Sequence, residues 1–280
     1  MTHTDSPWHV HNFNLFASHF PRGSAVLIDS EVLEPRNQGA WGISEHDRVV
    51  WQYTRDSVGS AIPLFSPFRD PWKPCFNVGN TIIPLLHFAR ERAWPNVMLM
   101  EYDTVYRGDV KSLVERCSRF DFAAPRYGPV QQGWMWKKCI RDPRGKFPLK
   151  QPYRSLNCFS WYTGKALEFL WKQYTAGWTG HFEIVVASLL TWNGFKCDGL
   201  KGFHTDVSYN VGKSKPTNMT FGANTLYHPI RFEKHVRATY GAWKPEFAPK
   251  REDTDEMMTM IREPPSPRSE LKDEFPTDDS

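Results

Sequence analysis

Two carboxylates directly follow a short apolar run near the middle of the chain. Residues 97–100 read VMLM, and the next residues are Glu101, Tyr102 and Asp103. Because residues i and i+2 of an extended chain point to the same side, we expect the Glu101 and Asp103 side chains to point together. Carboxylate oxygens bind hard cations such as Mg²⁺ and Mn²⁺, which they commonly share with phosphate groups. The pattern predicts a metal site that neutralises a diphosphate; the alternative is a solvated strand-end turn in which Asp109 caps the following helix.

Strands and helices alternate around this stretch, which is typical of an α/β sheet with crossover helices. Strands are predicted at residues 24–28, 49–53, 97–100, 120–124 and 158–162. Helices are predicted after the capping pair Asn80-Thr81 through about Arg92, at 110–117, at 165–174, and after the stretch Gly180-His181-Phe182-Glu183 that leads into the last one. We expect a single domain with a mostly parallel central sheet flanked by helices. The wholly apolar run at 97–100 predicts a central strand covered on both faces. Open α/β sheets bind ligands outside the carboxyl ends of such strands.

The Glu-x-Asp stretch resembles the D-x-D motif of GT-A-fold glycosyltransferases. An apolar strand that ends in acid-x-acid follows a predicted helix and the turn Trp94-Pro95-Asn96. Residues 100–109 are similar to the E-Y-D-[TV]-x-[YF]-x-G-[DH] stretch of some bacterial, fungal and viral glycosyltransferase-like proteins. This similarity covers residues 80–235 and hardly touches residues 1–75. It implies a GT-A-like domain over residues 1–245, a nucleotide-sugar donor (a UDP-sugar is favoured) and Mn²⁺ or Mg²⁺, with Asp103 favoured over Glu101 as the direct ligand.

The resemblance also assigns two later residues. Glu183 opens a predicted buried helix 80 residues after Asp103, where inverting GT-A enzymes carry the acid that deprotonates the acceptor hydroxyl. A carboxylate can perform this step as a general base; the alternative is an acid that stabilises the helix dipole. His228 lies where GT-A enzymes often supply a late histidine to the metal, and imidazole is an acceptable ligand for Mn²⁺. A structural or exposed histidine is the alternative there.

Weaker assignments concern the rest of the donor. Arg55, Asp56 and Asn80 lie where the family binds the nucleoside, and Tyr53 or Trp51 is a candidate for stacking on the base. Lys213 lies in a segment that we expect to close over the diphosphate. Alternatively, Tyr53 is an ordinary strand residue and Lys213 belongs to a solvated basic loop.

Charge is divided unevenly along the chain. Residues 246–280 carry 11 acidic and 5 basic residues, which leaves residues 1–245 with 30 basic and 20 acidic residues and a charge of about +10. The segment 246–280 is also rich in Pro and Ser, so we expect a flexible acidic tail. The basic body is expected to attract polyanions.

Two acceptor classes fit a basic glycosyltransferase. A hydroxymethylated base in DNA is favoured, because cations bind phosphates and the basic aromatic segment 134–138 offers rings for stacking; the target base must then be flipped from the stack. Trp134, Trp136 and Trp161 are candidates for the acceptor groove. A cell-surface glycan is the alternative and calls for a basic amphipathic helix at the membrane, which we do not find.

Two other function classes remain open. A non-catalytic nucleic-acid-binding protein would use the same basic surface, but it leaves the ordered series of acids and His228 unexplained. A metal-dependent phosphodiesterase or nuclease would need more acids and histidines directed at a metal than the sequence offers.

The remaining composition favours a reducing compartment. No apolar run approaches the roughly 20 residues of a membrane helix, and the N-terminal residues MTHTDSPWHVHNF lack the regions of a signal peptide. The five cysteines are odd in number, widely spaced and without a Cys-x-x-Cys pair, which argues against a disulfide framework and a zinc site. We expect a cytoplasmic protein, or one in the host cytoplasm if it is viral.

Overall fold

The computed structural model describes residues 10, 13–14, 16–17, 19–20, 23–29, 49–59, 62, 79–102, 104–134, 136–200 and 225–227. Three predicted site residues, Asp103, Lys213 and His228, lie outside the described residues. The predicted tail at 246–280 also lies outside them.

The centre of the described chain is a four-stranded sheet with the strand order β11-β5-β9-β3. Its strands are β3 (Asn96–Met100), β5 (Phe122–Ala123), β9 (Phe159–Thr163) and β11 (Cys197–Asp198). Strand β9 runs antiparallel to both β3 and β5, and β11 runs parallel to β5. The expectation of a mostly parallel sheet is therefore wrong for the described strands, which form a mixed sheet. The reason is that β9 inserts between β3 and β5, so that these two strands are not hydrogen-bonded to each other.

The remaining strands form two-stranded pairs. Strand β1 (Ala25–Asp29) pairs in parallel with β2 (Val49–Tyr53), which is followed by the short helix α2 (Arg55–Gly59). Strand β4 (Val105–Arg107) pairs antiparallel with β12 (Thr225–Tyr227). In the long connection between β5 and β9, β6 (Gly128–Pro129) pairs with β8 (Tyr153–Arg154). In the same connection, β7 (Ile140–Arg141) pairs with β10 (Thr179–Gly180), which directly precedes α6.

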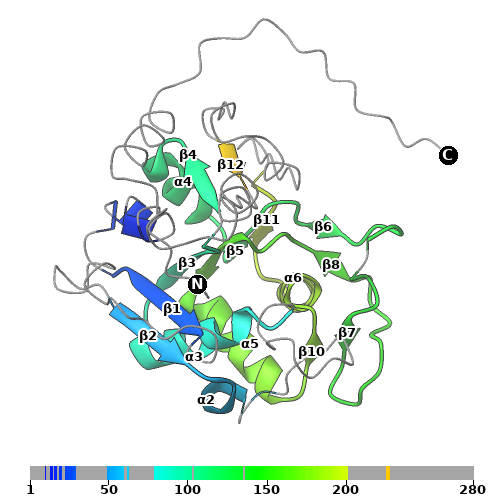
Figure 1. Ribbon diagram of the computed structural model, residues 1–280. Coiled ribbons are helices and arrows are strands. Elements are labelled where there is room, and N and C mark those ends of the chain that lie inside the picture. Colours follow the sequence, from blue (N-terminus) through cyan, green and yellow to red (C-terminus); the bar gives the residue numbers. More distant parts are fainter. Residues whose placement is uncertain are drawn as a thin grey trace, which may run out of the picture.

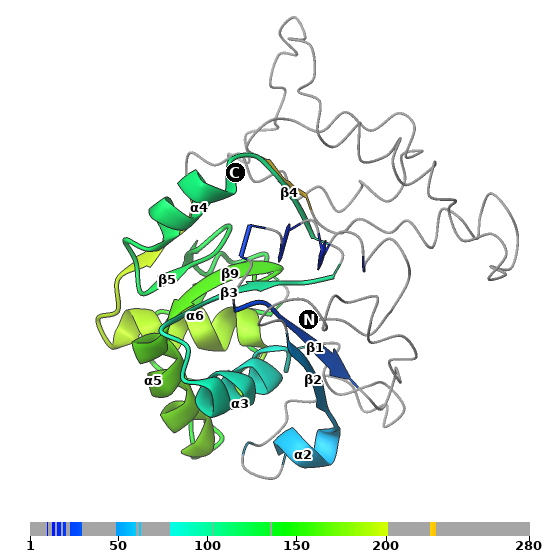
Figure 2. The same ribbon diagram turned by 90° about the vertical axis from the view of Figure 1, so that its left-hand side faces the viewer.

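Helices cover both faces of the central sheet. Helices α3 (Ile82–Arg92), α5 (Gly164–Thr175) and α6 (Phe182–Trp192) lie on one side of it, and α4 (Val110–Cys117) lies on the other (Figure 2). Helix α4 begins as its sequence indicates, because the Asp109 carboxylate accepts hydrogen bonds from the Lys111 amide at 2.9 Å and the Ser112 hydroxyl at 2.6 Å. Helix α3 begins differently, because Thr81, the residue just before it, makes no side-chain hydrogen bond to the first turn.

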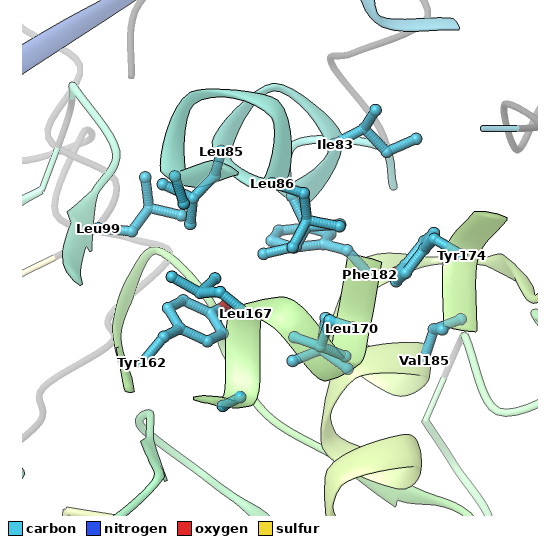
Figure 3. Close-up of a cluster of buried hydrophobic side chains, with 14 of the residues drawn as sticks. Ile83, Leu85, Leu86, Leu99, Tyr162, Leu167, Leu170, Tyr174, Phe182 and Val185 are labelled. Atoms are coloured by element: carbon cyan, nitrogen blue, oxygen red, sulfur yellow. The ribbon is translucent and has the colours of Figure 1, made fainter. Parts of the chain in front are cut away.

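Alternate residues of the sheet divide the core into two clusters. Val97, Leu99, Phe122 and Tyr162 pack towards α3, α5 and α6. Phe159, Trp161 and Ala123 pack with α4 instead. Figure 3 shows the larger cluster, in which side chains of α3 meet those of α5 and α6. This period of two follows from the pleat of the strands.

Strand β3 is only partly covered. Val97 and Leu99 are buried, whereas Met98 and Met100 are half-buried on the other face. In the sheet that the described residues form, β3 is an edge strand that pairs antiparallel with β9. The expectation of a central strand is therefore wrong for the described sheet, because an apolar run of four residues does not specify which strands pair with it. Both faces of β3 nevertheless contact core residues, since Met98 and Met100 pack against the smaller cluster.

Within the described ranges, no helix combines the length and the apolar character that crossing a membrane requires.

Candidate active site

The turn that begins at Glu101 is held against the start of β9. The amide of Glu101 donates to the carbonyl of Cys158 at 2.9 Å, which extends the β3–β9 ladder by one residue. Thr104 is fully buried; its amide donates to the Glu101 carbonyl at 3.0 Å and its hydroxyl to the Cys158 carbonyl at 3.1 Å. Both ends of the predicted metal-binding turn are thus anchored on the protein interior, on either side of Asp103.

The first turn of α6 is attached to the same short segment, residues 155–158. The amide of Ser155 donates to the Glu183 carbonyl at 3.0 Å. The Ser155 hydroxyl donates to the Asn157 side-chain oxygen at 2.7 Å, and the Asn157 amide group reaches the Phe182 carbonyl at 3.5 Å. Ser155 and Asn157 are buried, so this polar network is screened from water and strengthened by the low local dielectric. Segment 155–158 therefore connects the Glu101 turn to Glu183.

The beginning of α3 joins this arrangement. The amide of Phe182 donates to the Gly79 carbonyl at 2.9 Å, and Asn80 follows directly, with only 2% of its surface exposed. The Asn80 carbonyl accepts from the Ile83 amide at 2.9 Å. Three positions that are far apart in sequence, Asn80, Glu101 and Glu183, are thus linked through one hydrogen-bonded backbone region.

Glu183 lies beside a neutral histidine. The His181 Nδ1 atom accepts a hydrogen bond from the Glu183 amide at 3.4 Å and lies 3.9 Å from the Glu183 carboxylate. Burial lowers the pKa of His181 to about 3, so the imidazole is uncharged at neutral pH. The contact between the two side chains is therefore not an ion pair. Because Nδ1 accepts, the ring proton is on Nε2.

Trp136 covers this histidine. Its ring stacks on the His181 ring with 4.2 Å between centroids and 14° between planes. Trp136 belongs to the β5–β9 connection, which lies beside α6 and β10 in Figure 1. Of the three tryptophans predicted for an acceptor groove, Trp136 thus contacts His181, which lies two residues before Glu183. Trp161 instead is 6% exposed in the core and donates to the Phe120 carbonyl at 3.2 Å.

Gly180 allows β7 to approach the start of α6. Its φ angle is 141°, in the region that favours glycine, and a Cβ atom there would overlap the Cys139 carbonyl oxygen and lie 2.9 Å from the Ile140 Cα atom. The His181 amide also donates to the Cys139 carbonyl at 2.8 Å. The glycine in the Gly180-His181-Phe182-Glu183 motif therefore has a steric function, which the sequence analysis missed.

Arg154 interacts electrostatically with Glu183 and with Arg126. The Arg154 guanidinium donates to the Gln131 side-chain oxygen at 2.8 Å, and its buried Nε has no partner among the described residues. Burial and the neighbouring Arg126 lower the pKa of Arg154, while the charge of Glu183 opposes this shift. Neither arginine was predicted from the sequence, because no local spacing relates positions 126 and 154 to position 183.

The predicted metal ligands fall mostly outside the described residues. Of Glu101, Asp103 and His228, the structure describes Glu101. The described ranges contain no cluster of three or more His, Cys, Asp or Glu side chains that could bind a metal ion. The pairing of β4 with β12 bears on the other two ligands. Tyr227, which precedes His228, is opposite Val105, which lies two residues after Asp103.

The predicted nucleoside site is only partly described. Tyr53 is 2% exposed and packs in the larger core cluster, which leaves its ring little surface for a base. Trp51 lies two residues earlier, and its indole nitrogen donates to Glu91 on α3 at 2.9 Å. Arg55 is the first residue of α2. The contributions of Tyr53 and Arg55 to donor binding stay predictions.

A separate cavity of about 430 Å³ lies along β3, and residues from both faces of this strand line it. Apolar side chains line most of it, among them Phe88, Trp94, Met98 and Trp161. Such a lining offers few donors to phosphate oxygens, so we do not assign the donor diphosphate to this cavity.

No protein-family model matches the chain, and no curated protein is similar to its sequence. Among solved structures, the chain is similar to the apo form of mouse xyloside xylosyltransferase 1, with 10% sequence identity and a TM-score of 0.43. The match covers 80% of this chain and 92% of the mouse chain.

Proposed function

We propose that the protein is a metal-dependent glycosyltransferase of the GT-A type that moves a sugar from a nucleotide-sugar donor to an acceptor hydroxyl. The observation that carries the proposal is the segment 155–158, which binds the Glu101 turn at one end and the first turn of α6 at the other. This arrangement supports a metal and diphosphate at the first point and a carboxylate base at the second. A UDP-sugar is the favoured donor by resemblance.

Glu183 is the proposed base. Its side chain is 14% exposed, so it is largely shielded but still reachable from solvent. The neutral His181 beside it does not neutralise the carboxylate, which leaves it able to accept a proton from the acceptor hydroxyl as that oxygen attacks the anomeric carbon. This role implies inversion at that carbon. In a retaining enzyme Glu183 would bind acceptor hydroxyls instead.

Glu101, Asp103 and His228 are the proposed metal ligands. The β4–β12 pairing supports this set, because it joins the chain just after Asp103 to the chain just before His228. A bound Mn²⁺ or Mg²⁺ would neutralise charge on the diphosphate leaving group. Asn80, Tyr53, Arg55 and Lys213 are the proposed further contacts of the donor.

The acceptor is proposed to lie on the side of the β5–β9 connection. Residues 124–158 contain eight basic residues and a single acid, Asp142. From this connection Trp136 stacks on His181, and the charge of Glu183 acts on the Arg154 guanidinium. The charge supports an acceptor on a polyanion, for which a hydroxymethylated base in DNA is our first candidate. A glycan at an anionic membrane surface is the second candidate, and it is favoured by two exposed apolar side chains of the same connection, Phe147 and Leu149.

The test is incubation of the protein with a panel of nucleotide sugars and Mn²⁺ or Mg²⁺. We expect donor hydrolysis that is lost in Asp103→Ala, and mass spectrometry of hydroxymethylated and unmodified DNA from the same reactions reports on the acceptor. Failure to bind or hydrolyse any donor would overturn the glycosyltransferase proposal. Salt-dependent DNA binding without sugar transfer would support a non-catalytic nucleic-acid-binding protein instead.

A further inference from the structure

Between β7 and β8, the β5–β9 connection contains a loop with an unusual surface. Residues 141–150, which we name the basic loop, read RDPRGKFPLK. Phe147 is 45% exposed and Leu149 is fully exposed, and they are the large apolar side chains that are exposed within the described part of the chain. Exposed apolar side chains that occur together rather than singly indicate an interaction site.

The shape of the basic loop is defined by one buried acid. The Asp142 carboxylate accepts hydrogen bonds from the amides of Arg144 and Lys146, both at 2.9 Å, and from the Arg144 guanidinium at 2.8 Å. The Asp142 amide donates to the Lys146 carbonyl at 2.8 Å. Phe147 therefore follows a well-bonded turn, so its exposure is a property of the folded loop. Pro148 further restricts the backbone between the two apolar residues.

Cations surround the apolar pair. Arg141, Arg144, Lys146 and Lys150 are all exposed. The charge of Asp142 is offset by Arg144 at 2.8 Å, and no acid of the described chain forms an ion pair with Lys146 or Lys150. The basic loop thus presents apolar side chains directly between uncompensated positive charges.

This combination fits an anionic bilayer better than a nucleic acid. Lysines near a membrane are attracted to acidic lipid headgroups, and apolar side chains enter the boundary between headgroups and acyl chains. Nucleic acid would also attract the lysines, but it stacks its bases on aromatic rings and offers no apolar surface for an exposed leucine such as Leu149. We propose that the basic loop docks the protein on an anionic lipid surface, with Phe147 and Leu149 inserted and Lys146 and Lys150 bound to headgroups. This inference goes beyond the proposed function and does not require the protein to be a glycosyltransferase.

The loop is also connected to the candidate active site. It begins at β7, whose Ile140 pairs with Gly180 of β10, one residue before His181. Docking would therefore hold the start of α6 close to the lipid surface. The docking element is a loop without helical periodicity, not the basic amphipathic helix that a membrane-associated enzyme was expected to carry.

The test is sedimentation of the full-length protein with vesicles of phosphatidylcholine alone or with added phosphatidylglycerol. We expect binding to the anionic vesicles that weakens in high salt, and little binding to the neutral ones. Replacing both apolar residues (Phe147→Ser with Leu149→Ser) should lower the partition coefficient of the protein between vesicles and water by roughly tenfold or more. Lys146→Gln with Lys150→Gln should lower it by a similar factor, since each lysine contributes roughly fivefold. Lys111→Gln removes the charge of another exposed lysine, on α4 and outside the basic loop, and should change binding little.

Several results would overturn the inference. One is vesicle binding that is absent, or equal for neutral and anionic lipids; another is binding that the apolar double variant leaves unchanged. Binding of duplex DNA that is weakened by the lysine variants but not by the apolar variants, without vesicle binding, would assign the basic loop to nucleic acid. All the substituted side chains are exposed, so thermal unfolding should match the wild type. Donor hydrolysis in solution reports separately on the proposed function.

Discussion

The amide of Ser155 donates a hydrogen bond of 3.0 Å to the backbone carbonyl of Glu183. The same short segment ends at Cys158, whose carbonyl accepts from the Glu101 amide at 2.9 Å. The proposed base and the proposed metal turn are consequently both attached to one four-residue segment, 155–158, rather than to separate loops. Catalytic geometry benefits from such support, because small displacements of reacting groups reduce rates strongly.

The first prediction concerns Glu183. Glu183→Gln removes the proposed base and should lower kcat for sugar transfer by roughly 10²-fold or more, because an amide cannot accept the acceptor proton. Donor binding should persist, as measured by calorimetry with a nucleotide sugar. Glu115→Gln, at an exposed position of α4, is the matched control. If transfer is unchanged in Glu183→Gln, the carboxylate acts only on the helix dipole.

The second prediction concerns the metal ligands. Chelation of divalent cations should abolish donor hydrolysis, and addition of Mn²⁺ should restore it. Asp103→Ala should remove the activity, whereas Glu101→Ala should raise the Mn²⁺ concentration needed by roughly 10-fold to 100-fold, as expected for a supporting ligand. Titration of Mn²⁺ against the hydrolysis rate measures both effects. Equal losses in the two variants would contradict the primary role of Asp103, and full activity in a chelator would contradict the metal site.

The third prediction concerns Gly180. Gly180→Ala should lower the free energy of unfolding by about 3 kcal/mol, because alanine is strained at a φ of 141° and its Cβ would overlap the Cys139 carbonyl. Urea denaturation measures the change. Gly133→Ala serves as the control, since a Cβ at that position meets nothing within 4 Å. Similar stabilities for the two variants would show that β7 does not approach the start of α6 so closely.

The fourth prediction concerns pH. Burial lowers the pKa of His181 from 6.5 to about 3, so the unfolded chain takes up a proton below pH 6.5 while the folded protein does not. Above pH 6.5 the burial of His181 therefore causes no loss of stability. As the pH decreases from 6.5 towards 3, the free energy of unfolding falls, by about 2 kcal/mol at pH 5. His181→Asn keeps a capping side chain and should lose this contribution. Denaturation of both proteins at pH 8 and pH 5 tests it, and an equal pH dependence would count against a buried, neutral His181.

Local patterns predicted many of the elements. The strand at 49–53 and the helix at 110–117 have the predicted bounds, because alternation, apolar periodicity and the Asp109 cap depend only on neighbouring residues. The helix that Gly180-His181-Phe182-Glu183 was expected to open begins at Phe182. These signals say where a strand or helix lies, but not which strand lies next to it.

Residue types and spacing along the chain predicted Glu101 and Asp103 as metal ligands, and the resemblance to GT-A glycosyltransferases added Glu183 and His228; these roles stay predictions. The tertiary structure alone decided that β9 inserts beside β3, that Ser155 and Asn157 connect the Glu101 turn to α6, and that Trp136 stacks on His181. The physical reason is that strand pairing, burial and the lowered pKa of His181 arise from contacts between residues far apart in sequence, which no local spacing encodes.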